Sequence, residues 1–103
     1  MKMQQRTKIF EETLETVIEV TDIPKEDILG PSREADVCLA RKLFFYTLRK
    51  KGLRVTSISR MLKLRGCSFV SSTIVKNYQT AEALVKKKDD EFTELLYELK
   101  KGI

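Results

Sequence analysis

The stretch SISRMLKLRGCSFVSSTIVKNY, residues 57–78, holds two short amphipathic segments separated by Gly66. The apolar residues of the first segment lie at i, i+3 and i+4 and share one helical face: Ile58, Met61 and Leu62. In the second segment they recur every four residues, with small hydroxyl residues, a lysine and an asparagine between them: Val70, Ile74 and Tyr78. The pattern predicts two helices joined by a short turn, the second with a small polar face.

Helical periodicity continues on both sides of this stretch. Upstream, residues 7–22 carry a narrow apolar stripe, and residues 24–29 fit a short helix with Pro24 in its first turn. The segment 33–52 is apolar on nearly every side, which is typical of a helix through the middle of a core. Downstream, a helix is expected from Ser68 or Ser71 to Lys88, and the last spans residues 90–101, with Gly102 after it.

Residues that are typical of helix starts and ends lie between these segments. Ser32 is expected to cap the helix within residues 33–52, and Thr56 or Ser57 the first helix of the opening stretch. Gly52 fits a helix stop, and Asp89 fits the cap of the last helix. No alternation typical of a sheet occurs. The sequence therefore predicts one all-α domain over residues 1–103, with five or six helices.

Charge is divided unevenly along the 103 residues. Residues 1–30 have a net charge of −3, residues 31–88 one of +11, and residues 89–103 again one of −3. A protein that needed only solubility would mix its signs. Positive charge gathered in the middle of the chain points to a polyanionic partner, most often nucleic acid, although a solvated basic face would have the same composition.

Residues suited to catalysis or metal binding are scarce. The chain has no histidine, which removes the commonest general base and the commonest zinc ligand, and its two cysteines stand far apart. The cluster Asp89–Glu91 could hold a metal ion, but acids at a helix start are usually caps, and Cys67 at a turn reads as a half-buried thiol. Without a glycine-rich phosphate loop, we expect no enzyme, no metal and no cofactor.

The composition also bears on where in the cell the protein is located. No apolar run approaches the roughly 20 residues that cross a bilayer, and the basic start lacks the apolar segment of a signal peptide. Cys38 and Cys67 form no CxxC pattern and read as reduced thiols. We therefore expect a cytoplasmic protein that does not insert into membranes.

The paired helices 56–63 and 68–88 fit a helix–turn–helix, in which the second helix enters the major groove of DNA. Side chains expected to reach bases or phosphates follow the turn: Ser68, Ser71, Ser72, Thr73, Lys76 and Asn77. Basic residues expected on phosphates surround it: Arg54, Lys63, Arg65 and Lys76. The local pattern also fits an ordinary helical hairpin, and the +11 segment favours DNA.

Two other kinds of partner stay open. The domain could be a helical protein-interaction module that binds an acidic partner through its apolar and basic faces, or that uses its acidic N- or C-terminal helices. Structured RNA is a weaker alternative, because the aromatic residues of the basic region, Phe44, Phe45 and Tyr78, read as core rather than as stacking platforms.

The sequence resembles the C-terminal, origin-binding domain of the bacterial replication initiator DnaA over residues 7–99. VIEVTDIPKEDILGPSR is similar to that domain's entry segment, LARKLFFYTLRKKG to its long central helix and SISRMLKLRG to the first helix of its helix–turn–helix. The resemblance implies a Trp-repressor-like fold and sequence-specific binding of double-stranded DNA in replication initiation or a related regulatory role. Arg33 and Arg41 match two family arginines eight residues apart, and the match implies that Arg33 reaches into the minor groove.

The recognition helix matches the family in either of two registers. An ungapped register aligns residues 65–70 with the signature Arg-Asp-His-Thr/Ser-Thr-Val, so that Ser68 opens the helix and Val70 is core. A register with about four inserted residues places Ser71, Ser72 and Thr73 at the opening and Ile74 in the core. Both lack the Asp–His pair of the family. The inserted register is the one we favour, because it buries the stripe that starts at Ile74.

Overall fold

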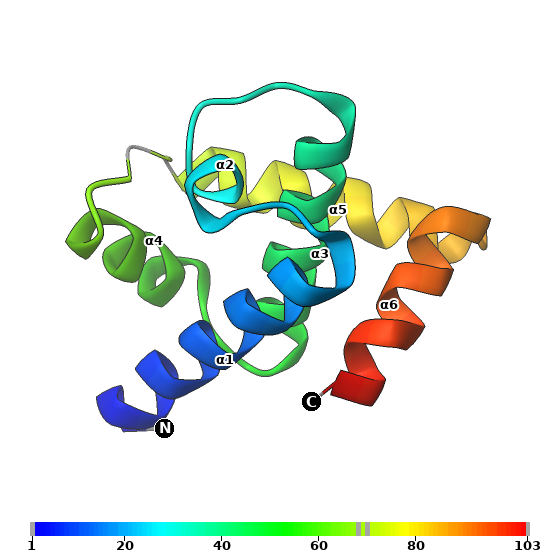
Figure 1. The fold of residues 1–103 in the computed structure, drawn as a ribbon. Coiled ribbons are helices and arrows are strands. Elements are labelled where there is room, and N and C mark those ends of the chain that lie inside the picture. Colours follow the sequence, from blue (N-terminus) through cyan, green and yellow to red (C-terminus); the bar gives the residue numbers. More distant parts are fainter. Residues whose placement is uncertain (1, 68, 70, 103) are drawn as a thin grey trace.

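The computed structural model describes residues 2–67, 69 and 71–102, and in these ranges it contains six helices and no strand. The helices are α1 (Met3–Thr21), α2 (Lys25–Ile28), α3 (Ala35–Lys50), α4 (Val55–Leu64), α5 (Ser71–Lys86) and α6 (Asp90–Gly102) (Figure 1). The all-α class is confirmed, and so is the order of elements expected from periodicity. The helix expected over residues 7–22 starts earlier, at Met3.

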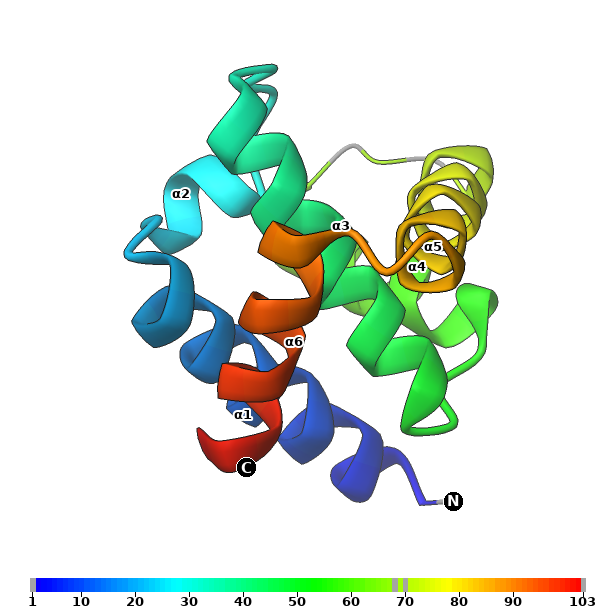
Figure 2. The same cartoon turned by 90° about the vertical axis from the view of Figure 1, so that its right-hand side faces the viewer.

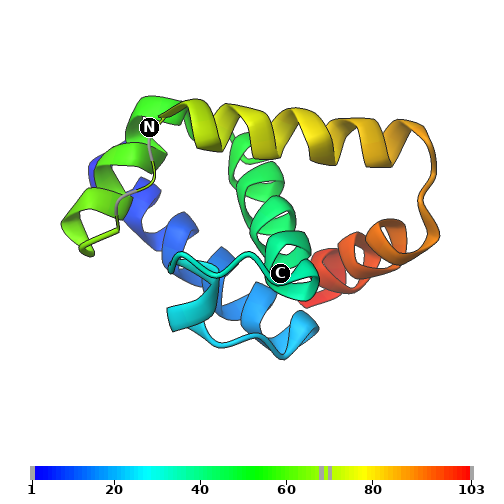
Figure 3. The same ribbon diagram turned by 90° about the horizontal axis from the view of Figure 1, so that it is seen from above.

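Helix α3 runs through the centre of the molecule, with α1 and α6 on one side and α5 on the other (Figures 2 and 3). Five of its apolar residues are fully buried in the middle of the core: Ala40, Leu43, Phe44, Phe45 and Leu48. Phe44 meets Phe10 of α1 edge-on, with the ring centroids 5.1 Å apart, and lies 5.6 Å from Phe45. This confirms the prediction of a central helix that is apolar on nearly every side.

The other helices each bury one stripe against α3 or its neighbours. Buried residues come from α1 (Phe10, Leu14 and Val17), from α4 (Ile58, Met61 and Leu62), from α5 (Ile74 and Ala81) and from α6 (Phe92 and Leu99). Helix α4 packs against both α1 and α5. The stripes read from the sequence are therefore the faces that form the core; Val70, which the sequence also assigned to the core, lies outside the described residues.

Two of the expected helix starts were wrong. Glu34, not Ser32, precedes the first residue of α3, and Arg54 precedes α4, so Thr56 and Ser57 lie inside its first turn. Ser32 instead accepts a hydrogen bond from the Glu34 N–H at 3.4 Å, within the loop before the helix. Asp89 is the cap of α6 as expected, because its carboxylate accepts the Phe92 N–H at 3.0 Å.

Glycines in left-handed conformation end α3 and α4. Gly52 has φ of 97° and Gly66 has φ of 78°. The next N–H in each case reaches back to the helix: Leu53 donates to the Leu48 carbonyl at 3.1 Å, and Cys67 to the Leu62 carbonyl at 2.9 Å. These hydrogen bonds, made just after a left-handed glycine, satisfy carbonyl groups that have no partner within the last turn of the helix. The break noticed in the sequence is therefore a C-cap at Gly66.

Gly66 offers a direct test of this turn. A Cβ atom there would meet no described atom within 4 Å, so the cost of Gly66→Ala comes from the left-handed backbone alone. We expect Ala to lower the free energy of unfolding by about 1 kcal/mol, and Asn, which tolerates this conformation, to lower it less. Urea titration followed by circular dichroism measures both. Equal stability of the Gly, Ala and Asn proteins would contradict the assignment.

Candidate nucleic-acid interface

Helix α5 presents the small polar residues of the opening stretch at its first turns. It begins at Ser71, and Ser72 and Lys76 are exposed, while Thr73 and Asn77 are half-buried. The Asn77 amide nitrogen donates to the Thr73 carbonyl at 2.8 Å, one turn back. Fully buried Ile74 anchors the opposite face of the same turn. The start at Ser71 and the burial of Ile74 agree with the inserted register.

The exposed face of α5 carries positive charge without compensation. Glu82, the acidic residue of this helix, is half-buried and accepts a hydrogen bond from the Tyr78 hydroxyl at 3.3 Å. The exposed charged residues of α5 are Lys76 and Lys86, and exposed Lys87 and Lys88 follow. No acidic residue occurs in the sequence between Asp36 and Glu82, so the turn before α5 adds none, whereas the turn after Lys88 begins the acidic run Asp89–Glu91.

Arg33 lies in the loop between α2 and α3, and its side chain is exposed. The peptide groups on both sides of it are hydrogen-bonded. The Ser32 carbonyl accepts from Arg41 Nη1 at 3.1 Å, and the Glu34 N–H donates to Ser32 Oγ at 3.4 Å. The loop thus holds the backbone of Arg33 while leaving its guanidinium in solvent.

Two further predicted residues lie at the ends of α4. Arg54 and Lys63 are exposed at the start and in the last turn of the helix. Arg60, which the sequence analysis did not single out, is exposed between them, and Leu64 beside Lys63 is 78% exposed. The exposed side chains of α4 are therefore basic, polar or apolar, and none is acidic.

Arg65 lies apart from this group. Its guanidinium forms an ion pair with Glu11 of α1, donates to the Met61 carbonyl at 2.9 Å and lies 4.4 Å from the ring centroid of Phe10. These contacts join the end of α4 to α1. The structure therefore gives Arg65 a packing role, and the phosphate contact expected from the sequence stays a prediction. Ser68, the remaining predicted contact, lies outside the described residues.

Arg41 is the residue that the sequence analysis undervalued. It is 6% exposed, and its guanidinium is bonded to four backbone carbonyls, two at the end of α2 and two in the loop before α3. Burial lowers the pKa of Arg41 from its usual value. A signal was present, because Arg41 occupies the i+4 position of the apolar stripe formed by Val37, Phe44 and Leu48. A charged residue in such a stripe must find its partners inside the protein.

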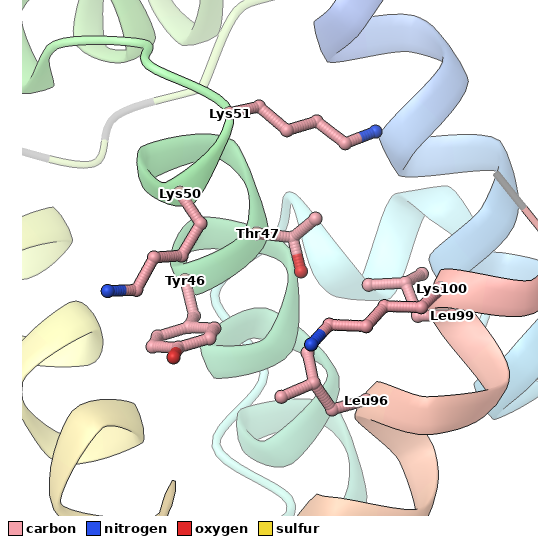
Figure 4. A pocket seen from close by; sticks show the side chains of 7 residues that line it. All are labelled: Tyr46, Thr47, Lys50, Lys51, Leu96, Leu99 and Lys100. Atoms are coloured by element: carbon pink, nitrogen blue, oxygen red, sulfur yellow. The ribbon is translucent and has the colours of Figure 1, made fainter.

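A groove of about 420 Å³ lies between the end of α3 and α6 (Figure 4). Tyr46, Thr47, Leu96 and Leu99 line it together with Lys50, Lys51 and Lys100. Lys51 reaches across to α1, where it donates to Thr13 Oγ1 at 3.3 Å; burial lowers the pKa of Lys51, and Glu12 partly offsets this. The groove thus combines an apolar floor with a cationic rim.

The described residues contain no group of three or more His, Cys, Asp or Glu side chains placed to hold a metal ion. Cys67 is half-buried at the end of the α4 turn, and burial raises the pKa of its thiol, against a smaller opposite effect of Arg65. A raised pKa leaves less thiolate at neutral pH. The absence of an enzymatic activity stays a prediction.

Neither a family model, nor a curated protein, nor a solved structure matches the chain. No helix of the described residues combines the length and the apolar content that crossing a membrane requires. A function must therefore be argued from the side chains of this chain itself.

Proposed function

We propose that this domain binds double-stranded DNA through its helix–turn–helix, with α5 in the major groove and Arg33 in the adjacent minor groove. The observation that carries the proposal is the exposed face of α5, where hydroxyl residues and lysines stand without an exposed acid. A helix fits the major groove, and hydroxyl, amide and ammonium groups bond base edges and phosphates there.

The elements around α5 supply the remaining contacts. Ser71, Ser72 and Thr73 open the helix, where free N–H groups and the helix dipole favour a phosphate. Arg54 and Lys63 are exposed on α4, the helix that crosses the backbone in this mode of docking. Arg33, on a loop with a fixed backbone, is suited to a narrow A·T-rich minor groove, where the potential is most negative.

The biological role that we propose is replication initiation or a related regulatory process. It depends on the resemblance to the DnaA origin-binding domain, which the pattern of residues 57–78 and the arginines at positions 33 and 41 support. This chain lacks the Asp–His pair of the family's recognition helix, so we expect its preferred site to differ from the usual DnaA box. Selection of bound sequences from random duplex DNA would identify that site.

Salt dependence tests the proposal. If four to six phosphates are neutralised, the logarithm of duplex affinity should fall against the logarithm of salt concentration with a slope of about −4 to −5. Duplex DNA should bind more tightly than single-stranded DNA of equal length. Fluorescence anisotropy with labelled oligonucleotides measures both quantities. A flat salt dependence would contradict DNA binding.

Two lysine variants assign the contact to α5. Lys76→Gln should reduce the magnitude of the slope by about 1, because one phosphate contact is removed. Lys101→Gln is the matched control: Lys101 is exposed on α6 and lies 3.9 Å from the Glu98 carboxylate, on the other side of α3. Equal effects of the two variants would show that charge alone, without docking of α5, determines binding.

The groove between α3 and α6 favours a second candidate function, a protein-interaction module for an acidic partner. Lys50, Lys51 and Lys100 surround its apolar floor, which suits an acidic peptide with apolar side chains (Figure 4). The exposed acids of α1 and α6 offer a second surface to a basic partner. Binding of an acidic amphipathic peptide that Lys100→Glu abolishes, with no affinity for duplex DNA, would favour this alternative.

A further inference from the structure

We infer that Arg41 is a positioning residue that holds the Arg33 loop and Phe69, which lies before α5, in one fixed relation. The inference deepens the proposed function and rests on it, because the loop carries Arg33, which we place in the minor groove, and Phe69 leads into α5, which we place in the major groove. Arg41 itself is buried, so it acts on DNA only through other residues.

Four hydrogen bonds join the Arg41 guanidinium to the end of α2 and to the loop that follows it. The acceptors are backbone carbonyls, with Nε bonded to Ile28 at 2.9 Å, Nη1 to Ser32 at 3.1 Å, and Nη2 to Asp27 at 3.0 Å and Gly30 at 2.8 Å. The carbonyls at the end of a helix as short as α2 lack partners within the helix. Arg41 supplies those partners and continues past the helix end to Ser32.

The bond to Ser32 is the one that acts on Arg33. A carbonyl oxygen and the following nitrogen belong to one planar peptide group, so holding the Ser32 oxygen also fixes the position of the Arg33 nitrogen. The chain is closely packed nearby, since a Cβ atom on Gly30 would lie 2.4 Å from the Glu26 carbonyl oxygen. The backbone of Arg33 is therefore set before any ligand binds.

The same guanidinium also contacts the connection that leads into α5. The Arg41 Cζ atom lies 4.9 Å from the ring centroid of Phe69, two residues before Ser71. Phe69 in turn packs edge-on against Phe45 of α3, with the centroids 6.1 Å apart. One planar group, in the N-terminal half of α3, thus touches both segments. The relative position of the two segments therefore depends on Arg41. So does the distance between Arg33 and α5, which we place in the two grooves.

The decisive experiment measures the coupling between Arg33 and Arg41. In the wild-type background, Arg33→Ala should weaken binding to an A·T-flanked duplex by about tenfold. Arg41→Lys keeps the charge, but a single ammonium cannot bond four carbonyls in a fork. In the Arg41→Lys background, Arg33→Ala should change affinity per folded molecule by less than about twofold, because Arg33 is no longer held in place.

Arg49→Lys is the matched control. Arg49 is half-buried in the last turn of α3, at the end of the helix away from the Arg33 loop, where it donates to the Leu53 carbonyl at 3.1 Å and lies 5.4 Å from the Tyr78 ring centroid. In its background, Arg33→Ala should keep the full tenfold effect. A tenfold effect that persists with Arg41→Lys would overturn the inference while leaving DNA binding intact.

A measurement without variants or DNA covers the case in which Arg41→Lys fails to fold. The backbone amide order parameter of Arg33 in the wild-type protein should lie near 0.85, the value of rigid backbone. A value below about 0.6 would overturn the inference. Failure of the wild-type protein to bind duplex DNA would instead overturn the proposed function, and this positioning role with it.

Discussion

Phe44→Ala is expected to lower the free energy of unfolding by about 3–5 kcal/mol, the range for removing a large aromatic side chain from a core. Phe44 is fully buried at the centre of α3 and contacts the rings of Phe10 and Phe45. A small domain has only about 5–15 kcal/mol in total, so the midpoint temperature should fall on the order of 20 °C. Thermal unfolding followed by circular dichroism measures the shift.

Leu64→Ala provides the comparison for this core variant. Leu64 is also a large apolar residue, but it is 78% exposed at the end of α4. Its truncation should change stability by no more than about 0.5 kcal/mol. Similar losses in the two variants would mean that α3 is not the centre of the core.

Arg33→Ala should have the opposite profile, with a large effect on DNA affinity and almost none on stability. The side chain is exposed, and the bonds that hold the loop come from Ser32 and Arg41 rather than from Arg33. We expect affinity for an A·T-flanked duplex to fall about tenfold, and the preference for A·T pairs at the edge of the site to relax. Competition between duplexes with A·T and G·C flanks measures both effects.

The thermal midpoint of the same variant decides how a loss of affinity is interpreted. An unchanged midpoint with weaker binding places Arg33 on the DNA. A lower midpoint, with normal affinity per folded molecule, would make Arg33 a structural residue. Lys25→Ala, in which an exposed cation of neighbouring α2 is removed, controls for a general loss of charge.

Periodicity in the sequence was sufficient for the helices and for most of the core. The stripe in α1 and the all-round apolar character of α3 are patterns within one helix, and burial follows from them directly. The caps at Gly52 and Asp89 are equally local. Such features depend on residues at most a few positions apart, which is why they could be predicted.

Features that depend on distant residues could not be predicted in this way. Arg65 looks like any basic residue at a turn, and its partner Glu11 is 54 positions away. Serine is a typical residue at a helix start. The Ser32 carbonyl, however, is bonded to Arg41, and the loop continues to Glu34 before α3 begins. The polar residues of α5 were predicted to be accessible, and Ser71, Ser72 and Lys76 are exposed; what they bind stays a prediction.

The arrangement of charged helices on either side of α3 gives the molecule a permanent electric dipole moment. On one side of α3, α1 and α6 expose more acidic than basic residues, whereas α5 on the other side exposes lysines and no acid (Figure 2). In the electric field of a polyanion, such a molecule experiences a torque that turns α5 towards the polyanion before the two make contact. Alignment of this kind raises association rates by roughly 10- to 1,000-fold and fades as ionic strength rises. The acidic helices thus help to orient a surface of which they are no part.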